Sequence, residues 1–108
     1  MERFRRFKLF AFFHFKGEDP YLRVKRVAQK CADTYHVNFE GVDDRLDGAL
    51  QELKPGEWEV MVGWSTYAPN PHEAENLARK LYESLKRELG EAFIELENPK
   101  HRITVESD

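Results

Sequence analysis

Two segments of the chain alternate with the period of two that is typical of strands. Residues 4–15 are dense in aromatic side chains, which favour strands, and residues 57–67 have the same period. The first segment places a wholly apolar set on one face: Phe7, Leu9, Ala11, Phe13 and Phe15. Its other face carries Lys8, Phe10, Phe12 and His14. The second segment has Trp58, Val60, Val62 and Trp64 on one face, and Glu59, Met61, Gly63 and Ser65 on the other. We expect the wholly apolar set of the first strand to lie in the core.

Two other segments have apolar residues at helical spacing. Asp19 can cap a helix that starts at Pro20 and is expected to run from about 20 to 35. Its apolar stripe is Tyr21, Val24, Ala28, Cys31 and Tyr35. Another helix is expected between the cap Asn70 and the terminating Gly90, with Pro71 as its first residue. Its apolar stripe is Ala74, Leu77, Ala78, Leu81, Leu85 and Leu89.

The remaining segments give shorter elements. Residues 37–41 alternate and predict a short strand that ends at Gly41. Residues 43–53 predict a helix that the KPG sequence at 54–56 ends, although Gly48 within it costs about 1 kcal/mol relative to alanine. The apolar residues of this helix would be Leu46, Leu50 and Leu53. Residues 92–107 predict a hairpin with its turn at 98–100, in which Ile94 and Leu96 share an apolar face with Ile103 and Val105.

The predicted order is therefore strand, helix, short strand, helix, strand, helix, strand, strand. Long amphipathic helices beside a sheet with one polar face predict an α+β two-layer sandwich. The helices would cover one face of a mixed or antiparallel sheet. If residues 37–41 are not a strand, the other elements approach a ferredoxin-like split βαβ arrangement. A length of 108 residues predicts one domain, 1–108.

Composition excludes several classes of protein. With 41% hydrophobic and 34% charged residues, the chain is expected to be globular rather than disordered. It has no run of about 20 apolar residues, so we expect no membrane span and no membrane partner. The apolar stretch near the N-terminus is interrupted by Lys8 and His14 and is followed by no small-residue cleavage site, so no secretory signal is expected. Cys31 is the only cysteine, which favours a reducing compartment, the cytoplasm.

Charge is distributed unevenly along the chain. Residues 1–30 hold nine Lys/Arg and three Asp/Glu, a net charge of +6, whereas residues 31–108 carry a net charge of −9. Such asymmetry is typical of a nucleic-acid or membrane-surface patch, or of a molecule that attracts its own copies. The alternative is that the two segments interleave in the fold, so that their charges mix on the surface.

The aromatic strand has more apolar side chains than one core face can take. With one set in the core, an interface or ligand face is predicted on the other side of the sheet, formed by Phe10, Phe12, His14 and Met61. Burying one such ring contributes roughly 1.5–3 kcal/mol, so rings left in water usually have a cover. The cover is a short element of the same chain, a second copy of the same protein, or a ligand such as stacked bases.

The sequence KLFAFFHF, residues 8–15, resembles the RNP1 octapeptide of RNA recognition motif domains. Lys8, Phe10, Ala11, Phe12 and Phe15 match that pattern. Leu9 stands in place of its glycine, Phe13 in place of its aliphatic residue, and the octapeptide lies in the first strand here rather than the third. The resemblance implies that Phe10 and Phe12 stack on bases. The phosphate contacts predicted with it are Arg3, Arg5, Arg6 and Lys8.

Candidate chemistry elsewhere is sparse. Asp43, Asp44 and Asp47 have the spacing of a magnesium-binding aspartate motif, but acidic residues are also favoured at a helix start. Cys31 lies on an apolar stripe, which favours a packed thiol over a nucleophile. The four histidines lack the spacing of metal ligands, and no glycine-rich phosphate loop is present. We therefore expect no cofactor and no metal.

These observations favour a small non-catalytic domain that uses its aromatic sheet face for self-association or partner binding. Binding of RNA or single strands through the same face is the first alternative. A small-molecule pocket or an enzyme, near His14, Trp64 and Tyr67, is another, so catalysis is not excluded. The caps at Asp19 and Asn70 also suit a designed chain without evolved function, although Cys31 and Gly48 argue against design.

Overall fold

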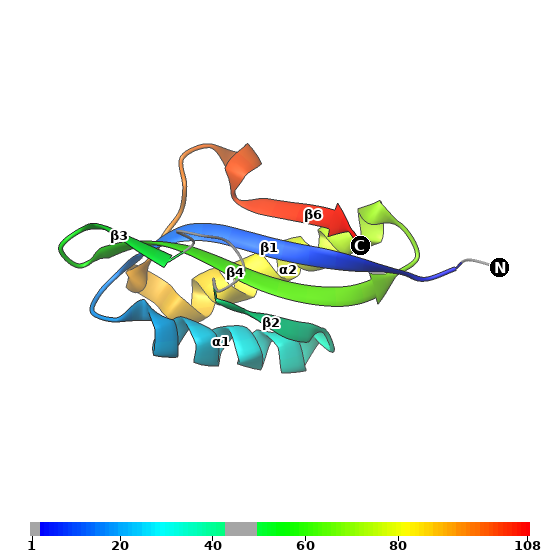
Figure 1. Ribbon diagram of the computed structural model, residues 1–108, viewed down its shortest axis with the longest axis horizontal. Helices are drawn as coiled ribbons and strands as arrows, with labels where there is room; N and C mark the ends of the chain where they lie inside the picture. Colours follow the sequence, from blue (N-terminus) through cyan, green and yellow to red (C-terminus); the bar gives the residue numbers. More distant parts are fainter. Residues whose placement is uncertain (1–2, 43–49) are drawn as a thin grey trace.

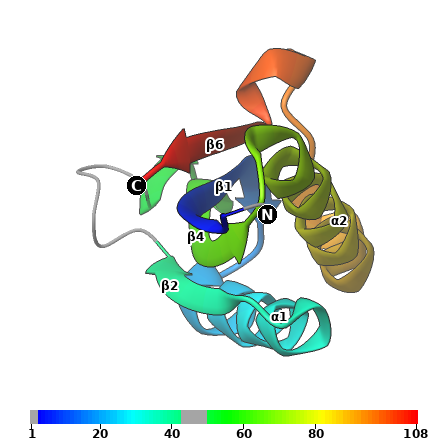
Figure 2. The ribbon, with the colours of Figure 1, turned by 90° about the vertical axis from the view of Figure 1, so that its right-hand side faces the viewer.

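The computed structural model describes residues 3–42 and 50–108. The strands are β1 (Arg5–Lys16), β2 (Asn38–Val42), β3 (Leu50–Lys54), β4 (Glu57–Ala68), β5 (Phe93–Ile94) and β6 (Ile103–Ser107). The α-helices of these residues are α1 (Pro20–Tyr35) and α2 (Pro71–Leu89). Short 3₁₀ turns cover Gly90–Ala92 and Pro99–His101. Both α-helices pack on an open antiparallel sheet (Figures 1 and 2), which confirms the predicted α+β class.

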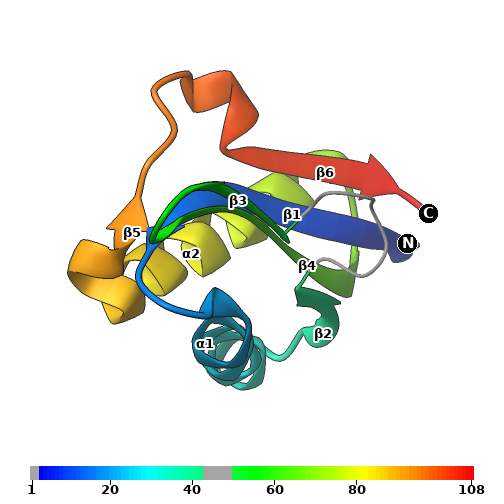
Figure 3. The same ribbon diagram turned by 60° about the vertical axis from the view of Figure 1, so that its left-hand side comes forward.

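The two longest strands form the centre of the sheet. β1 and β4 pair antiparallel over twelve residues each, from Arg5 opposite Ala68 to Lys16 opposite Glu57. On the outer side of β4, β2 and β3 pair with successive parts of that strand. On the outer side of β1, β6 and β5 pair with its first and second halves. Figure 3 shows β6 and β2 on opposite sides of the central pair.

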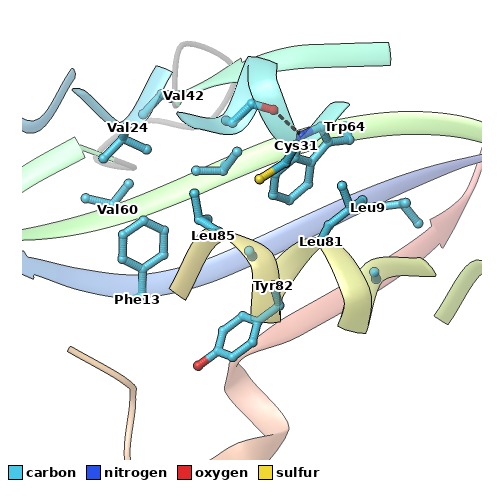
Figure 4. Close-up of a cluster of buried hydrophobic side chains, with 14 of the residues drawn as sticks. Leu9, Phe13, Val24, Cys31, Val42, Val60, Trp64, Leu81, Tyr82 and Leu85 are labelled. Atoms are coloured by element: carbon cyan, nitrogen blue, oxygen red, sulfur yellow. Dashed lines mark hydrogen bonds between the residues drawn. The ribbon is translucent and has the colours of Figure 1, made fainter. Parts of the chain in front are cut away.

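The core lies between the helices and the predicted apolar face of β1. All five residues of that face are at most 1% exposed, as we expected from the alternation. They pack with Val60, Val62 and Trp64 of β4 and with the apolar stripes of α1 and α2 (Figure 4). The buried indole of Trp64 donates a hydrogen bond through Nε1 to the Ala28 carbonyl of α1, at 3.1 Å. This bond satisfies the polar atom of the largest core side chain and fixes α1 against the sheet.

The predicted caps are present at both helices. The Asp19 carboxylate accepts a hydrogen bond from the Tyr21 amide, and the Asn70 side chain accepts one from the Glu73 amide. Pro20 and Pro71 follow the caps, where the missing N–H has no intrahelical acceptor to lose. Gly90 ends α2 with φ of 59°, a conformation that costs glycine little.

The predicted helix at 43–53 is wrong for its last part, because residues 50–54 form β3. This strand pairs with Glu57–Val60 of β4 through the turn at Gly56, where φ is 82°. Pairing with a long central strand overrides the helical spacing of the leucines. The rest of that prediction lies outside the described residues, together with the candidate metal ligands Asp43, Asp44 and Asp47.

The predicted C-terminal hairpin is also wrong. β5 and β6 do not pair with each other; each pairs with β1, β5 at His14 and Phe15 and β6 at residues 7–11. Residues 95–102 leave the sheet between them and include the turn Pro99–His101 (Figure 3). The alternating residues of this tail therefore include two strands, but both strands pair with the N-terminal strand β1.

Phe10 and Gly63 form a close cross-strand pair on the face opposite the helices. A Cβ atom built on Gly63 would lie 3.3 Å from Cε1 of Phe10 and 3.8 Å from Cβ of Glu40. Because Gly63 has no side chain, the Phe10 ring can lie against the backbone of residue 63 on the neighbouring strand.

Gly63→Val should lower the free energy of unfolding by about 1–3 kcal/mol, because overpacking displaces the Phe10 ring. Urea denaturation of Gly63→Val, Phe10→Ala and the double variant measures the coupling between the two positions. We expect the double variant to be more stable than the sum of the single effects. Additive effects would contradict the contact.

Candidate interaction surface on the open face of the sheet

The structure brings the four residues of the predicted aromatic face together. Cross-strand partners in an antiparallel pair share a face. Phe12 lies opposite Met61, Phe10 opposite Gly63 and His14 opposite Glu59. The rings of Phe10 and Phe12 have centroids 6.5 Å apart and are tilted by 39°. These residues lie on the face of the sheet opposite the core that the helices cover.

Their exposure differs strongly. Phe10 is 9% exposed and Met61 is 3% exposed, whereas Phe12 and His14 are half-buried. Most of the apolar surface at Phe10 and Met61 is therefore removed from water within the chain itself. Phe12 and His14 are the members of the predicted face that a partner can still reach.

Ion pairs border this face on the side of the N-terminus. Arg6 pairs with Asp108 and, at 3.5 Å, with Glu40, and Lys8 pairs with Asp108 at 3.8 Å. The hydroxyl of Ser65, which is fully buried, donates to Glu40 Oε2 at 2.7 Å. Residues from four strands or strand ends thus form one polar rim.

The four predicted phosphate contacts are divided by the structure. Arg6 and Lys8 lie on the open face, where carboxylates partly neutralise them. Arg5 lies on the other face, with its guanidinium 5.4 Å from the centroid of the Phe7 ring. Arg3 is exposed. Basic charge is therefore not gathered into one patch by these residues.

Other predicted candidates are separated or buried. Trp64 lies in the core, while His14 and Tyr67 lie toward opposite ends of the central strand pair, so the three do not form a pocket together. Cys31 is 1% exposed and its Sγ lies 3.4 Å from the Ser84 hydroxyl. Burial raises the pKa of the Cys31 thiol, which keeps it protonated at neutral pH, as expected for a packed thiol.

The described residues form neither a metal-binding cluster nor a membrane-spanning helix. Within 3–42 and 50–108, no group of three or more His, Cys, Asp or Glu side chains is placed to hold a metal ion. Neither helix of that part of the chain is long and apolar enough to cross a membrane.

A groove that the sequence did not predict lies between α2 and residues 95–103. It has a volume of about 620 Å³, and its lining includes Tyr82, Glu95 and Arg102. The Tyr82 hydroxyl donates to Glu95 Oε2 at 2.7 Å, and Lys86 Nζ donates to the same oxygen at 3.2 Å. Arg102 lies 3.5 Å from the other carboxylate oxygen. Tyr82 is adjacent to the predicted stripe of α2 in sequence, but nothing local identifies Glu95 as its partner.

The electrostatics of this cluster indicate a structural role. The hydrogen bond from Tyr82, with help from Lys86 and Arg102, lowers the pKa of Glu95. Burial, together with the hydrogen bond to Glu95, raises the pKa of the Tyr82 phenol. The carboxylate is thus held charged and the phenol neutral, so neither group is tuned to exchange protons near neutral pH. The cluster holds the segment 95–102, which leaves the sheet between β5 and β6, against α2.

Glu95→Gln should lower the free energy of unfolding by about 1 kcal/mol at pH 7, because the amide attracts Lys86 and Arg102 less strongly. The folded-state pKa of Glu95 lies below its unfolded value of about 4.3. The stabilisation is therefore present above that pH and is lost as pH falls through the folded pKa. Urea titrations at pH 7 and pH 3 should show the difference shrinking in acid. The exposed Glu97→Gln is the control, and equal pH dependence in both variants would contradict the cluster's role.

Comparison of the sequence with protein-family models and with curated proteins found no match.

Proposed function

We propose that this chain is a non-catalytic protein-association domain that acts through the open face of its sheet. One observation supports the proposal most directly: both α-helices cover the same face, and the opposite face carries a half-buried Phe12 beside Phe10 and Met61. Phe10 and Met61 are buried within the chain, so Phe12 and His14 lie beside a packed apolar base. Preorganised aromatic side chains lose little conformational entropy when they are buried at an interface.

The surroundings of Phe12 have the anatomy of a protein interface. An apolar centre is bordered by the ion pairs that Arg6 and Lys8 make with carboxylates. Protein interfaces typically combine a desolvated aromatic centre with a charged, hydrated rim. Because these rim charges are already paired, a partner could dock beside them without leaving an unpaired charge buried.

Phe12→Ser tests this proposal, with Leu22→Ser as the matched control. Leu22 is 63% exposed on α1, away from the open face, so the control removes an accessible apolar side chain of similar kind elsewhere. Affinity capture on the immobilised chain should show that Phe12→Ser loses association with its partner protein. The Leu22→Ser control should keep it.

Unfolding measurements must accompany this test, because Phe12 is partly buried. Phe12→Ser should retain a cooperative urea transition at micromolar concentration. Unchanged association in a folded Phe12→Ser protein would reject the open face as the interface.

Binding of single-stranded nucleic acid is a second candidate, and one observation favours it. Phe4 and Tyr67 are both 62% exposed near the exposed Arg3 and Arg5, at the end of the central strands where β1 begins. Exposed aromatic rings beside basic residues are the usual platform for stacked bases. The burial of Phe10 and the pairing of Arg6 with carboxylates favour protein association over this alternative.

This candidate is tested by titration of a fluorescent single-stranded RNA at several salt concentrations. Nucleic-acid binding requires an affinity that falls steeply with salt and weakens in the Arg3→Ala, Arg5→Ala double variant. We expect neither effect. Salt-dependent binding that the double variant reduces would favour the nucleic-acid function instead.

We further propose the ferredoxin-like arrangement for this fold. β2 and β3 pair with successive parts of β4, and β6 and β5 pair with successive parts of β1, so each edge can be counted as one interrupted strand. Counted so, the chain order becomes βαββαβ with the two central strands β4 and β1 between the interrupted edges, as in a split βαβ fold. A cytoplasmic location is part of the same proposal, supported by the buried free thiol of Cys31.

A further inference from the structure

β6 forms one edge of the sheet, and its outward side carries hydrogen-bonding groups of the backbone. In the described part of the chain, β6 pairs only with β1. The bonds at the two ends of this pairing run from the Asp108 amide to the Arg6 carbonyl and from the Phe12 amide to the Arg102 carbonyl. Antiparallel pairing alternates hydrogen-bonded and non-hydrogen-bonded residues. The backbone N–H and C=O groups of the even-numbered residues of β6 therefore face β1. Those of Ile103, Val105 and Ser107 point away from it.

This edge lacks three of the features that usually protect an edge strand, namely proline, lysine and a bulge. Natural edges are blunted by proline, lysine or bulges. β6 has the sequence ITVES, without proline or lysine, and its register with β1 is unbroken over residues 103–107. The opposite edge is different, because β2 and β3 each have a register shift against β4. β6 is therefore the edge strand whose pairing register is unbroken. Figure 3 shows it at the margin of the sheet.

An apolar groove runs beside β6 on the helix side of the sheet. It has a volume of about 410 Å³ and is lined by Phe7, Pro71, Ile103 and Val105, with Glu75, Thr104 and Ser107. Ile103 and Val105 are half-buried there. A strand added at β6 would offer the backbone partners that the edge lacks, and its alternate side chains would enter this groove.

We propose that β6 pairs antiparallel with β6 of a second copy of this chain, with Val105 of each copy at the two-fold axis. The charges on either side of the strand argue for this occupant. Residues 100–102 (KHR) precede β6 and are basic, whereas residues 106–108 (ESD) at its end are acidic. In this register, residues 106–108 of one copy lie opposite residues 104–102 of the other, so Arg102 is the residue of the basic segment that meets the acidic segment. With Val105 on the axis, Arg102 of one copy lies opposite Asp108 of the other. Each also has partners in its own chain, Glu95 for Arg102, and Arg6 and Lys8 for Asp108.

The dimer is expected to depend on concentration. A pair of five-residue strands and a narrow groove make a smaller contact than the standard interface of about 1,600 Å². Because β6 is an edge and Phe12 lies on a face, this inference does not rest on the proposed function of the open face.

Amide hydrogen exchange tests the pairing residue by residue. In dilute protein, the amides of Thr104 and Glu106 should be protected by β1, while those of Ile103, Val105 and Ser107 exchange rapidly. On concentration from about 10 µM to about 1 mM, the odd-numbered amides should become protected and the mass from light scattering should approach twice 12.8 kDa. A mass that stays at 12.8 kDa throughout would overturn the proposal.

Charge variants at the axis test the register. Val105→Lys and Val105→Glu each place like charges opposite one another, so each alone should weaken the dimer roughly tenfold or more. An equimolar mixture of the two should restore it, because lysine then faces glutamate. Asn38→Lys, an exposed site on the opposite edge, is the matched control and should dimerise like the parent chain.

The outcomes separate this edge from the open face. Loss of the dimer in the Val105 variants with retention in Phe12→Ser supports edge pairing. Retention in the Val105 variants, or failure of the mixture to restore the dimer, overturns the proposed axis. If the Val105 variants do not show cooperative urea transitions, Val105→Thr replaces them, because this change adds no charge. Hydrogen exchange at the odd-numbered amides of Val105→Thr then decides whether the two edges pair. Concentration-dependent protection at these amides then supports the pairing, and its absence rejects it.

Discussion

The unbroken antiparallel pairing of β1 with β4 is the constraint on which the rest of this structure depends. Twelve residues of each strand share one register, and successive side chains point to opposite faces. A slip of one residue would move the core residues of β1 to the other face and bring Phe10 and Phe12 under the helices. The same register sets Phe10 over Gly63, which leaves space for its ring. Core and open face are therefore two consequences of one pairing.

Elements whose hydrophobic period is long and whose ends carry specific residues could be predicted from the sequence. α1 and α2 begin after Asp19 and Asn70 because those side chains satisfy free amides, and each stripe then faces the sheet. The wholly apolar side of β1 identified the core for a similarly local reason. Its composition leaves no polar atom to satisfy after burial.

The predictions that were wrong concern features that depend on residues distant in the sequence. A short alternating tail does not specify whether it folds on itself or joins a strand at the other end of the chain, and here β1 offered the longer surface. Leu50 and Leu53 had helical spacing, yet pairing with β4 decided their conformation. The burial of Phe10 and Met61 and the contact of Tyr82 with Glu95 likewise depend on side chains brought together by the fold. Such contacts leave no trace in a local pattern.

The uneven charge of the sequence is largely resolved by the same topology. β1 carries much of the basic segment, and the strand beside it ends in the acidic C-terminus, so Asp108 meets Arg6 and Lys8. Lys30 of α1 similarly meets Glu88 of α2, at 3.2 Å. The charges of the two segments therefore mix on the folded surface, which weakens the electrostatic case for a phosphate-binding patch.

The open face and the β6 edge are related by geometry, although they are separate surfaces. In an antiparallel pair of identical strands, the two-fold axis at Val105 stands perpendicular to the sheet. Both helical layers would then lie on one side of a continuous sheet, and both open faces on the other. A partner that binds near Phe12 would meet two equivalent sites on one surface. For a divalent partner, the second contact would then be intramolecular and strengthened by its effective concentration. Edge pairing would in this way increase the avidity of the open face without changing any contact within it.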